Sequence, residues 1–453
     1  MALNFRQWLE RDTGTPALGL EALPSRSTSV RFDQIRAQIH REIVAEMDLR
    51  KFEGVPIDTL KRELQAWVER LVSAKNIPVN EAELRQIVEG IQHEMLGLGP
   101  IEPLLSDPSV SDILVNGPHR IYVERRGRIE PSPVAFDDDT HLMRVIERIV
   151  SRVGRRIDEM NPMVDARLPD GSRVNAVIPP LAIDGPQLSI RRFAVIPYTL
   201  IDLLHFETLT PNMAELIQGL VKARVNLMVS GGTGSGKTTL LNVISASIPE
   251  NERIVTIEDA AELQLQQQHV VRMESRPPNM EGKGEITPRA LLRNSLRMRP
   301  DRIIVGEVRG AEVLDMLQAM NTGHEGSMTT IHANTPRDAV TRLEHMLGMA
   351  GVTADVRTVR QQISAALSVV IQVSRLSDGR RRVISVQEIL GMEGDMLTMQ
   401  EIFKFEQFGL DVNGQVQGRF VATGIRPRAM DRLKSRGIHL RSDLFTPPDE
   451  QGT

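Results

Sequence analysis

The sequence has no cysteine, and this absence excludes disulfide bonds, thiolate catalysis and cysteine-ligated zinc or iron–sulfur centres. Aromatic residues are scarce, at 3% of the chain, which argues against a surface for stacking nucleobases. Neither charge sign dominates, because 55 basic and 59 acidic residues give a net charge of −4. The overall field therefore does not favour nucleic acid or an anionic membrane as the partner. The composition fits a reducing compartment, with the cytosol as the default.

Long apolar runs are missing too. No stretch approaches the roughly 18 consecutive apolar residues of a membrane-spanning helix, and the best candidates are interrupted by Pro179 and Pro180 or by the glycines at 231–236. The first residues lack the charged and apolar regions of a secretory signal. We therefore expect neither a membrane span nor export. With 453 residues, the chain has room for about three domains of roughly 150 residues each.

The spacing of apolar and turn-forming residues divides the chain into five segments. Residues 1–30 are rich in turn formers and are expected to form a flexible leader, and residues 31–99 predict a three-helix module. Short strands around one helix predict a small α+β domain over residues 100–205. Residues 206–445 form the largest predicted domain, and residues 446–453 form a tail.

The largest segment alternates strands with helices. Strands, each beside a helix-like stretch, are predicted at 227–230, 254–257, 302–306 and 328–331. Two more strand-like runs follow at 369–373 and 383–386. Such alternation is typical of an α/β fold with a mainly parallel, helix-flanked sheet.

A phosphate-binding motif follows the first of these strands. Residues 231–238 read Gly-Gly-Thr-Gly-Ser-Gly-Lys-Thr and fit the pattern G-x-x-x-x-G-K-[ST] between a strand and a helix. In this motif, glycines let backbone N–H groups turn toward a phosphate, the lysine neutralises the β- and γ-phosphates, and the threonine hydroxyl binds Mg²⁺. The candidate nucleotide-binding residues are Gly231, Gly232, Thr233, Gly234, Ser235, Gly236, Lys237, Thr238 and Thr239.

Hydrolysis also needs a group that orients water, and a carboxylate at the end of a neighbouring strand suits that role. Glu307 directly follows a predicted strand and is the best candidate, although Gly306 stands where an aspartate usually holds Mg²⁺ through water. Glu258 and Asp259 end the preceding strand, and the carboxyl ends of parallel strands share one edge of a sheet. The candidate metal ligands are thus Thr238, Glu258 and Glu307, and Glu307 and Glu258 are also candidate catalytic residues.

A histidine ends the strand that comes after Glu307. His332 is placed to donate a hydrogen bond from a neutral imidazole to a γ-phosphate, which makes it a candidate catalytic residue. His324, considered singly, is interpreted as structural.

Together these motifs resemble the secretion-superfamily ATPases of type II and type IV secretion and of type IV pili. The four boxes of that superfamily occur here in order, at 231–238, 257–259, 305–310 and 322–334, and a glycine before the Walker B glutamate is an expected feature there. Four further segments look like the CpaF-like branch of Tad (tight adherence) pilus assembly ATPases. These segments are Leu98–Leu105, Ser111–Gly117, Asp170–Ala176 and Leu188–Phe193.

The resemblance implies a RecA-like P-loop ATPase core, preceded by a small α+β (PAS-like) domain and an N-terminal three-helix module. It implies a homo-hexamer that uses ATP and Mg²⁺ at the cytoplasmic face of a bacterial inner membrane, held there through its partners. The motor would act on an integral-membrane platform protein to assemble pilin, with retraction left open. The resemblance also suggests that Arg173 and Arg191 reach the triphosphate when the domains close, and leaves Arg167 open between that role and a surface salt bridge.

Two other functions stay open at this point. The same core serves ring translocases of nucleic acid, and a ring that only binds nucleotide would be a gated scaffold. Three arginines at Arg289, Arg293 and Arg297 share one predicted helix face. With a net charge of −4 and few aromatics, they favour a subunit interface or a nucleotide-facing edge over direct contact with nucleic acid.

Overall fold

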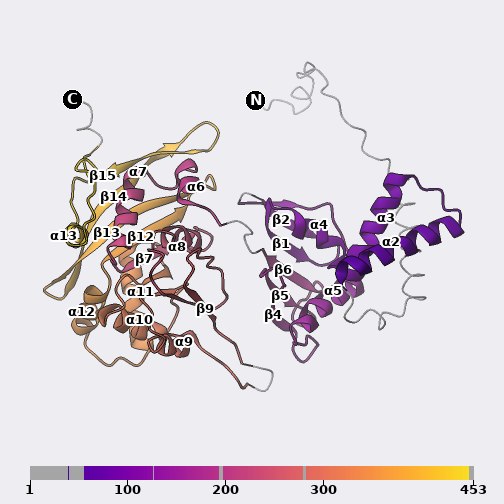
Figure 1. Ribbon diagram of the computed structural model, residues 1–453, viewed down its shortest axis with the longest axis horizontal. Coiled ribbons are helices and arrows are strands. Elements are labelled where there is room, and N and C mark those ends of the chain that lie inside the picture. Colours follow the sequence, from indigo (N-terminus) through magenta and orange to yellow (C-terminus); the bar gives the residue numbers. More distant parts are fainter. Residues whose placement is uncertain (1–38, 40–55, 126, 193–196, 279–281, 448–453) are drawn as a thin grey trace, which may run out of the picture. The chain divides into compact units, whose positions relative to one another are not determined.

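The computed structural model describes residues 39, 56–125, 127–192, 197–278 and 282–447. These residues form two compact units, the first ending at Arg192 and the second beginning at Pro197 (Figure 1). The predicted leader at 1–30, and the first helix of the predicted three-helix module apart from Ile39, lie outside the described residues.

The first unit opens with two amphipathic helices, α2 (Ile57–Ala74) and α3 (Glu81–Leu96), at the positions where apolar residues recur at helical spacing. The start of α3 is fixed by a capping box, in which the Asn80 side chain accepts from the Glu83 N–H while the Glu83 carboxylate accepts from the Asn80 N–H. The apolar faces of the two helices meet in a small core of their own, which includes Val68 and Ile91.

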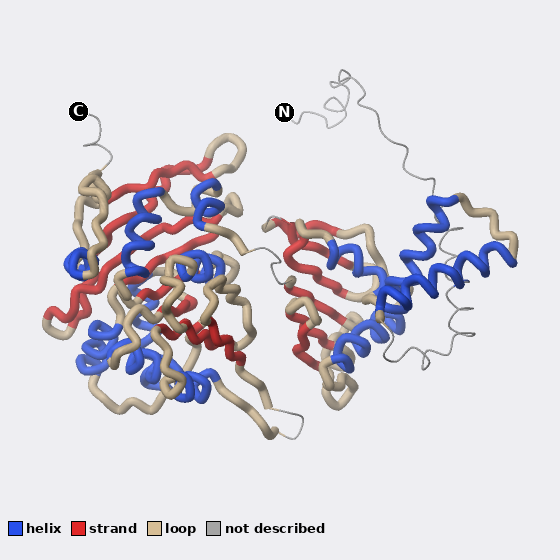
Figure 2. The backbone as a smooth tube through the Cα atoms, viewed as in Figure 1, coloured by secondary structure: helices blue, strands red, loops and turns tan. Residues whose placement is uncertain are grey.

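A six-stranded antiparallel sheet, whose strands are red in Figure 2, makes up most of the rest of the first unit. Its strand order is β3-β2-β1-β6-β5-β4. Its strands are β1 (Val110–Asn116), β2 (Ile121–Arg125), β3 (Arg128–Pro131), β4 (Met163–Arg167), β5 (Arg173–Val177) and β6 (Gln187–Arg191). The short helices η3 (Gly99–Ile101) and α4 (Glu102–Ser106) lead into it, and α5 (Asp139–Arg152) packs on one face. This arrangement is the predicted α+β class.

The second unit is built on a nine-stranded sheet in the order β15-β14-β13-β12-β7-β11-β10-β8-β9. Every pairing from β12 to β9 is parallel, and every pairing from β12 to β15 is antiparallel. The parallel strands are β7 (Leu227–Gly231), β8 (Ile254–Glu258), β9 (Val270–Glu274), β10 (Arg302–Val305), β11 (Met328–His332) and β12 (Val369–Arg375). The predicted α/β class with a parallel core is thus confirmed.

Helices cover both faces of this sheet, because successive residues of a strand point to opposite sides and both sides are apolar. One core contains Leu227 and Val229 of β7, and the other contains Met228 between them. The first core is covered by α6 (Leu200–His205), α7 (Pro211–Lys222), α8 (Lys237–Ser245) and α13 (Ala429–Ser435). The second is covered by α9 (Pro288–Ser295), α10 (Glu312–Asn321), α11 (Pro336–Met349) and α12 (Val356–Ala366).

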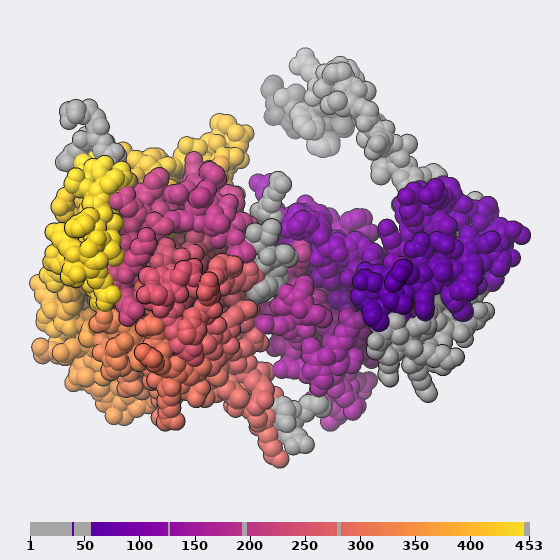
Figure 3. Space-filling view, in the orientation of Figure 1, coloured from indigo at the N-terminus to yellow at the C-terminus, as the bar shows by residue number. Residues whose placement is uncertain are grey.

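Two features of the second unit differ from the sequence prediction. Helix α6 packs Leu203 into the core of the large sheet, so residues 200–205 do not belong with the smaller domain to which we assigned them. The sheet is also extended by three long antiparallel strands, β13 (Arg381–Glu393), β14 (Met396–Leu410) and β15 (Val416–Ala422), of which only part of β13 was predicted. The turn joining β14 and β15 stands out from the surface (Figure 3), where Val412 is fully exposed.

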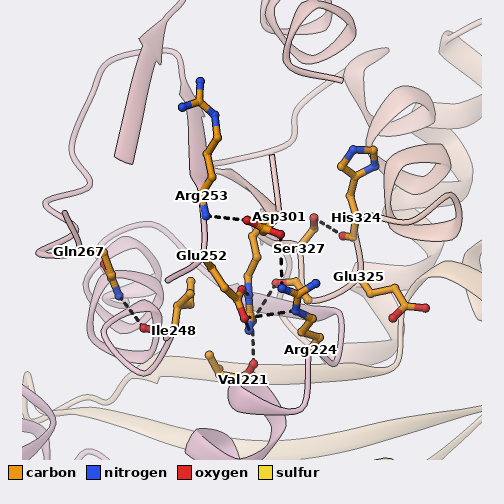
Figure 4. A network of polar contacts seen from close by, with 12 residues as sticks. Val221, Arg224, Ile248, Glu252, Arg253, Gln267, Asp301, His324, Glu325 and Ser327 are labelled. Carbon is orange, nitrogen blue, oxygen red and sulfur yellow. Dashed lines mark hydrogen bonds and ion pairs between the residues drawn. The ribbon is translucent and has the colours of Figure 1, made fainter. Parts of the chain in front are cut away.

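A buried ion pair lies at the amino end of β10, the end opposite Glu307. The Arg302 side chain is fully buried, and its Nη2 donates to Glu252 Oε1 at 3.2 Å while its Nη1 donates to the Val221 carbonyl at 2.7 Å. Arg224 adds a second cation, with its Nε 3.2 Å from Glu252 Oε1 (Figure 4). The network ties the loop before β8 to the start of β10 and the end of α7.

Because Glu252 neutralises a fully buried guanidinium, we expect Glu252→Gln to lower the free energy of unfolding by about 3–5 kcal/mol, the cost of leaving one charge of a buried pair unmatched. Thermal and urea denaturation measure the change. Glu215→Gln serves as the control, because it breaks an exposed ion pair with Arg441 and should shift the transition far less. Coincident melting curves for Glu252→Gln and the wild type would contradict the prediction.

Candidate nucleotide site

The glycine-rich loop joins the end of β7 to the start of α8. Gly234 and Gly236 have φ values of 69° and 95°, a region that favours glycine, so the loop turns tightly just before the helix. The Ser235 hydroxyl donates to the Gly232 carbonyl at 2.8 Å and closes the turn. Thr238 and Thr239 lie half-buried in the first turn of α8. A loop of this shape ending at a helix N-terminus is the cradle that a phosphate needs.

Lys237 begins α8 and is almost fully buried beside the loop. Its ammonium donates to the Gly232 carbonyl at 3.0 Å and lies 3.3 Å from His332 Nδ1. Burial lowers the pKa of Lys237, and the negative charge of Glu307 opposes that shift. Because the Lys237 ammonium is largely removed from water, an anion bound beside it would stabilise its charged form.

His332 connects Lys237 to Glu307. It ends β11, where it is paired in register with Gly231 of β7, and its Nε2 lies 3.2 Å from Glu307 Oε1. Burial, with the nearby Lys237 charge, lowers the pKa of His332 below its usual 6.5, so the ring is neutral at pH 7. The tautomer with its proton on Nε2 fits both contacts, because Nε2–H then donates to Glu307 and Nδ1 accepts from Lys237.

Glu307 follows β10 and is held by Arg309, a residue that our sequence analysis gave no role. The Arg309 guanidinium donates two hydrogen bonds to the Glu307 carboxylate, at 2.9 and 3.1 Å, and lies 3.6 Å from Asp259. The bonds to Glu307 raise the pKa of Arg309. The fork geometry of arginine therefore fixes the plane of the carboxylate proposed to orient water.

Glu258 lies on the neighbouring strand, buried beside Gly306. Its Oε2 accepts from the N–H groups of Glu262 and Leu263, at 2.7 and 2.9 Å, and its Oε1 is buried without a hydrogen-bond partner among the described residues. Burial raises the pKa of Glu258. A Cβ at position 306 would lie 2.8 Å from Glu258 Cγ, so the glycine is needed for the Glu258 side chain to fit. This close approach explains why Gly306 replaces the usual aspartate.

The residues at this edge fit a magnesium nucleotide. Among the residues that the structure describes, no group of three or more histidine and acidic side chains is placed to hold a metal ion. Mg²⁺ at nucleotide sites does not need one, since it keeps several waters and takes phosphate oxygens with one or two protein ligands. The hydroxyl of Thr238 and the unpartnered, buried Oε1 of Glu258 are oxygen donors of the right kind.

Arg173 and Arg191 belong to the first unit, where they form part of a row. In the register of the sheet, Arg167 of β4 pairs with Arg173 of β5, which pairs with Arg191 of β6. Paired residues on neighbouring strands share a face, so three cations stand side by side, and Asp112 offsets one of them with an oxygen 3.1 Å from Arg191 Nε. Their approach to a nucleotide stays a prediction.

Two of the three arginines predicted to share a helix face, Arg289 and Arg293, lie on α9, whereas Arg297 falls in the turn that follows the helix. Arg289 and Arg293 both reach Asp315 of α10, with N···O distances of 2.7 and 3.6 Å, and the Asp315 side chain is nearly buried. These contacts hold α9 against α10. A role at a subunit interface remains a prediction.

One further residue of the site gives no signal in the sequence. Gln372 is buried in the middle of β12, and its Nε2 donates to the carbonyls of Ala333 and Asn334, at 3.1 and 3.0 Å. These carbonyls directly follow His332. Gln372 therefore holds the loop that carries the histidine, from a strand 40 residues further along the chain.

Comparison with known proteins finds one family and many relatives. Residues 94–418 match the family described as "Type II/IV secretion system protein". A Mycobacterium tuberculosis protein named for conjugal transfer is 39% identical over 322 residues, which are 70% of this chain and 91% of that protein. The type IV secretion system protein VirB11 of Bartonella quintana is 30% identical, over 64% of this chain and 91% of its own length. The crystal structure of the Brucella suis VirB11 ATPase in complex with sulphate matches with 28% identity and a TM-score of 0.35, covering 63% of this chain and 94% of that one.

Proposed function

The chain belongs to the type II/IV secretion system protein family and is an ATPase, and we propose that it hydrolyses ATP to drive the assembly of pili of the Tad type. The proposal is supported by the residues that lie together at one edge of the second sheet. There the strand ends of β7, β11, β10 and β8 bring together the P-loop lysine, His332, Glu307 and Glu258. Strand carboxyl ends are where parallel α/β sheets bind ligands and do chemistry.

In the proposed mechanism, the N–H groups of the loop and the Lys237 ammonium bind the triphosphate. Lys237 then exchanges its contact with His332 for phosphate oxygens, and the Nε2–H of His332 turns from Glu307 to donate to the γ-phosphate. Glu307, held by Arg309, orients the attacking water and accepts its proton. Bound Mg²⁺, with Thr238 and Glu258 as its protein ligands, would neutralise charge on the phosphates.

The arginine row of β4, β5 and β6 supports a second part of the proposal. An arginine that contacts the transferred phosphoryl group stabilises its charge in the transition state, an effect of about 10³–10⁵ in rate when supplied as a finger. Arg173 and Arg191 are proposed to do this when the two units close on a nucleotide. Closure would couple the chemical state of the nucleotide to movement of the first unit.

We further propose that six copies form a ring at the cytoplasmic face of a bacterial inner membrane, bound through an integral-membrane platform protein. None of the helices that the structure describes is both long and apolar enough to span a bilayer, so contact through partners is the route the proposal takes. Purified protein is expected to release phosphate from Mg-ATP and to form six-membered rings in electron micrographs. Cells lacking the protein should lose surface pili and regain them with the wild-type chain only.

A second candidate is a motor that moves nucleic acid, because a relative is named for conjugal transfer. The net charge of −4 and the scarcity of aromatic residues weigh against direct contact with nucleic acid. Phosphate release measured with and without DNA, at low and high salt, separates the two. A flat response favours the pilus motor, whereas strong, salt-sensitive stimulation favours the translocase. The absence of turnover under any assembly condition would leave a nucleotide-gated scaffold.

A further inference from the structure

The glycine-rich loop at residues 231–238, the P-loop, packs against the β12–β13 hairpin of the same unit. A Cβ at Gly231 would lie only 2.3 Å from the Val373 carbonyl of β12, and a Cβ at Gly236 would lie 3.1 Å from Arg381 Cδ at the start of β13. At Gly234 the corresponding position is 3.9 Å from Arg375 Nη1. Three glycines of the motif thus lie next to this hairpin. Because they have no side chains, the hairpin can pack closely against the loop, which is a second reason for glycine there besides phosphate binding.

Arg381 makes a direct contact with the loop. Its Nε donates to the Gly234 carbonyl at 3.0 Å, and no acidic partner for its guanidinium occurs among the described residues. Because the peptide bond is trans, fixing the Gly234 carbonyl also fixes the opposite direction of the Ser235 N–H. The contact therefore orients the Ser235 N–H, a backbone donor of the loop whose nitrogen lies 3.4 Å from the Gly232 carbonyl oxygen in this structure.

Two arginines lie side by side at the end of the hairpin. Arg375 and Arg381 are direct register partners on β12 and β13, so their side chains lie close to one another. Both side chains are exposed at the end of the hairpin that borders the P-loop. Arginine suits phosphate oxygens, because its fork can donate to the loop and to a phosphate from the same side chain.

From these contacts we infer that Arg381 is a nucleotide-binding residue, supplied by the antiparallel extension of the same chain. It holds the P-loop through its Nε and places the rest of its charge beside the phosphates. This assignment rests on the proposed function, since it deepens the same site. It also links β13, and with it β14 and β15, to the presence of nucleotide.

Titration of the full-length protein with a fluorescent ADP analogue, followed by competition with ATP and ADP, tests the assignment. We expect Arg381→Ala to weaken the binding of both nucleotides by about tenfold, the loss typical of one charge-assisted contact. Arg381→Gln, which keeps an N–H donor without the charge, should weaken binding to a similar extent, and Arg381→Lys should recover part of the loss.

Arg380→Ala is the matched control, because Arg380 is the neighbouring residue and binds Gln415 and Asp378 instead of the loop. Wild-type affinity for Arg381→Gln, or equal affinities for Arg381→Ala and Arg380→Ala, would overturn the inference. Lys237→Ala separates it from the proposed function. If Lys237→Ala weakens binding and no Arg381 variant does, only this assignment fails; if the wild type binds no nucleotide, both fail. Should Arg381→Ala not fold, as judged by circular dichroism, the Gln and Lys variants carry the test.

Discussion

Lys237→Ala is expected to weaken the binding of ATP by about ten- to hundredfold, because it removes the cation proposed to face the phosphates, and charge-assisted hydrogen bonds are typically worth about 1.5–3 kcal/mol. A second cost follows from the proposed mechanism. Lys237 leaves His332 for the phosphate oxygens when ATP binds, so alanine also removes a charge that would stabilise the transferred phosphoryl group in the transition state. Hydrolysis should therefore fall further than affinity does.

Titration with a fluorescent nucleotide measures the first effect, and phosphate release at saturating ATP measures the second. The control is Lys222→Ala, which removes an exposed lysine from the last turn of α7 in the same unit. Unchanged affinity in Lys237→Ala would mean that the nucleotide does not bind at this loop.

The second large effect is expected for Glu307→Gln. The amide keeps the shape of the side chain but cannot accept a proton from water, so turnover should fall by about 10²–10⁴-fold while ATP still binds. Glu307 contacts Arg309 and His332 through both oxygens, and the amide can satisfy only part of these donors, which adds to the loss. Single-turnover phosphate release, together with nucleotide titration, separates chemistry from binding.

Glu258→Gln is the informative comparison for this variant. Glu258 is buried, with one oxygen bonded to backbone N–H groups and the other without a hydrogen-bond partner among the described residues, and burial raises its pKa, so it is the alternative carboxylate for the base. If Glu307→Gln turns over near the wild-type rate and Glu258→Gln does not, the role of general base belongs to Glu258.

The sequence predicted five of the six parallel strands of the second sheet, all except β9, for a physical reason. Strands such as β7 and β10 are buried on both faces, so they appear as short continuous apolar runs between helical stretches. Strands β14 and β15 were missed because much of their length is only partly buried and their pairing is interrupted by irregularities at Gln407 and Gly409. At such an irregularity, the residues that point to the buried face change from one alternate set to the other. The two-residue alternation of apolar and polar residues that predicts a strand is therefore broken.

Within the candidate site, too, some residues were predicted from the sequence and others were missed. The P-loop, Glu307, Glu258 and His332 follow strands in motifs of fixed spacing, and the structure gathers them at one edge. Gln372 and Arg381 act across separations of about 40 and 150 residues, where no spacing rule applies. Arg309 lay within a recognised motif, yet only its geometry reveals that it holds Glu307.

Because Gly306 packs against Glu258, the space between these two positions holds only one side chain. The carboxylate at this place can come from the end of β8, as here, or from the residue after β10, but not from both. We therefore expect that Gly306→Asp alone is not tolerated. The double substitution Gly306→Asp with Glu258→Gly moves the acidic residue from one strand to the other and preserves the charge of the site. Substitutions at these two positions are then expected to be tolerated as a pair and harmful one at a time.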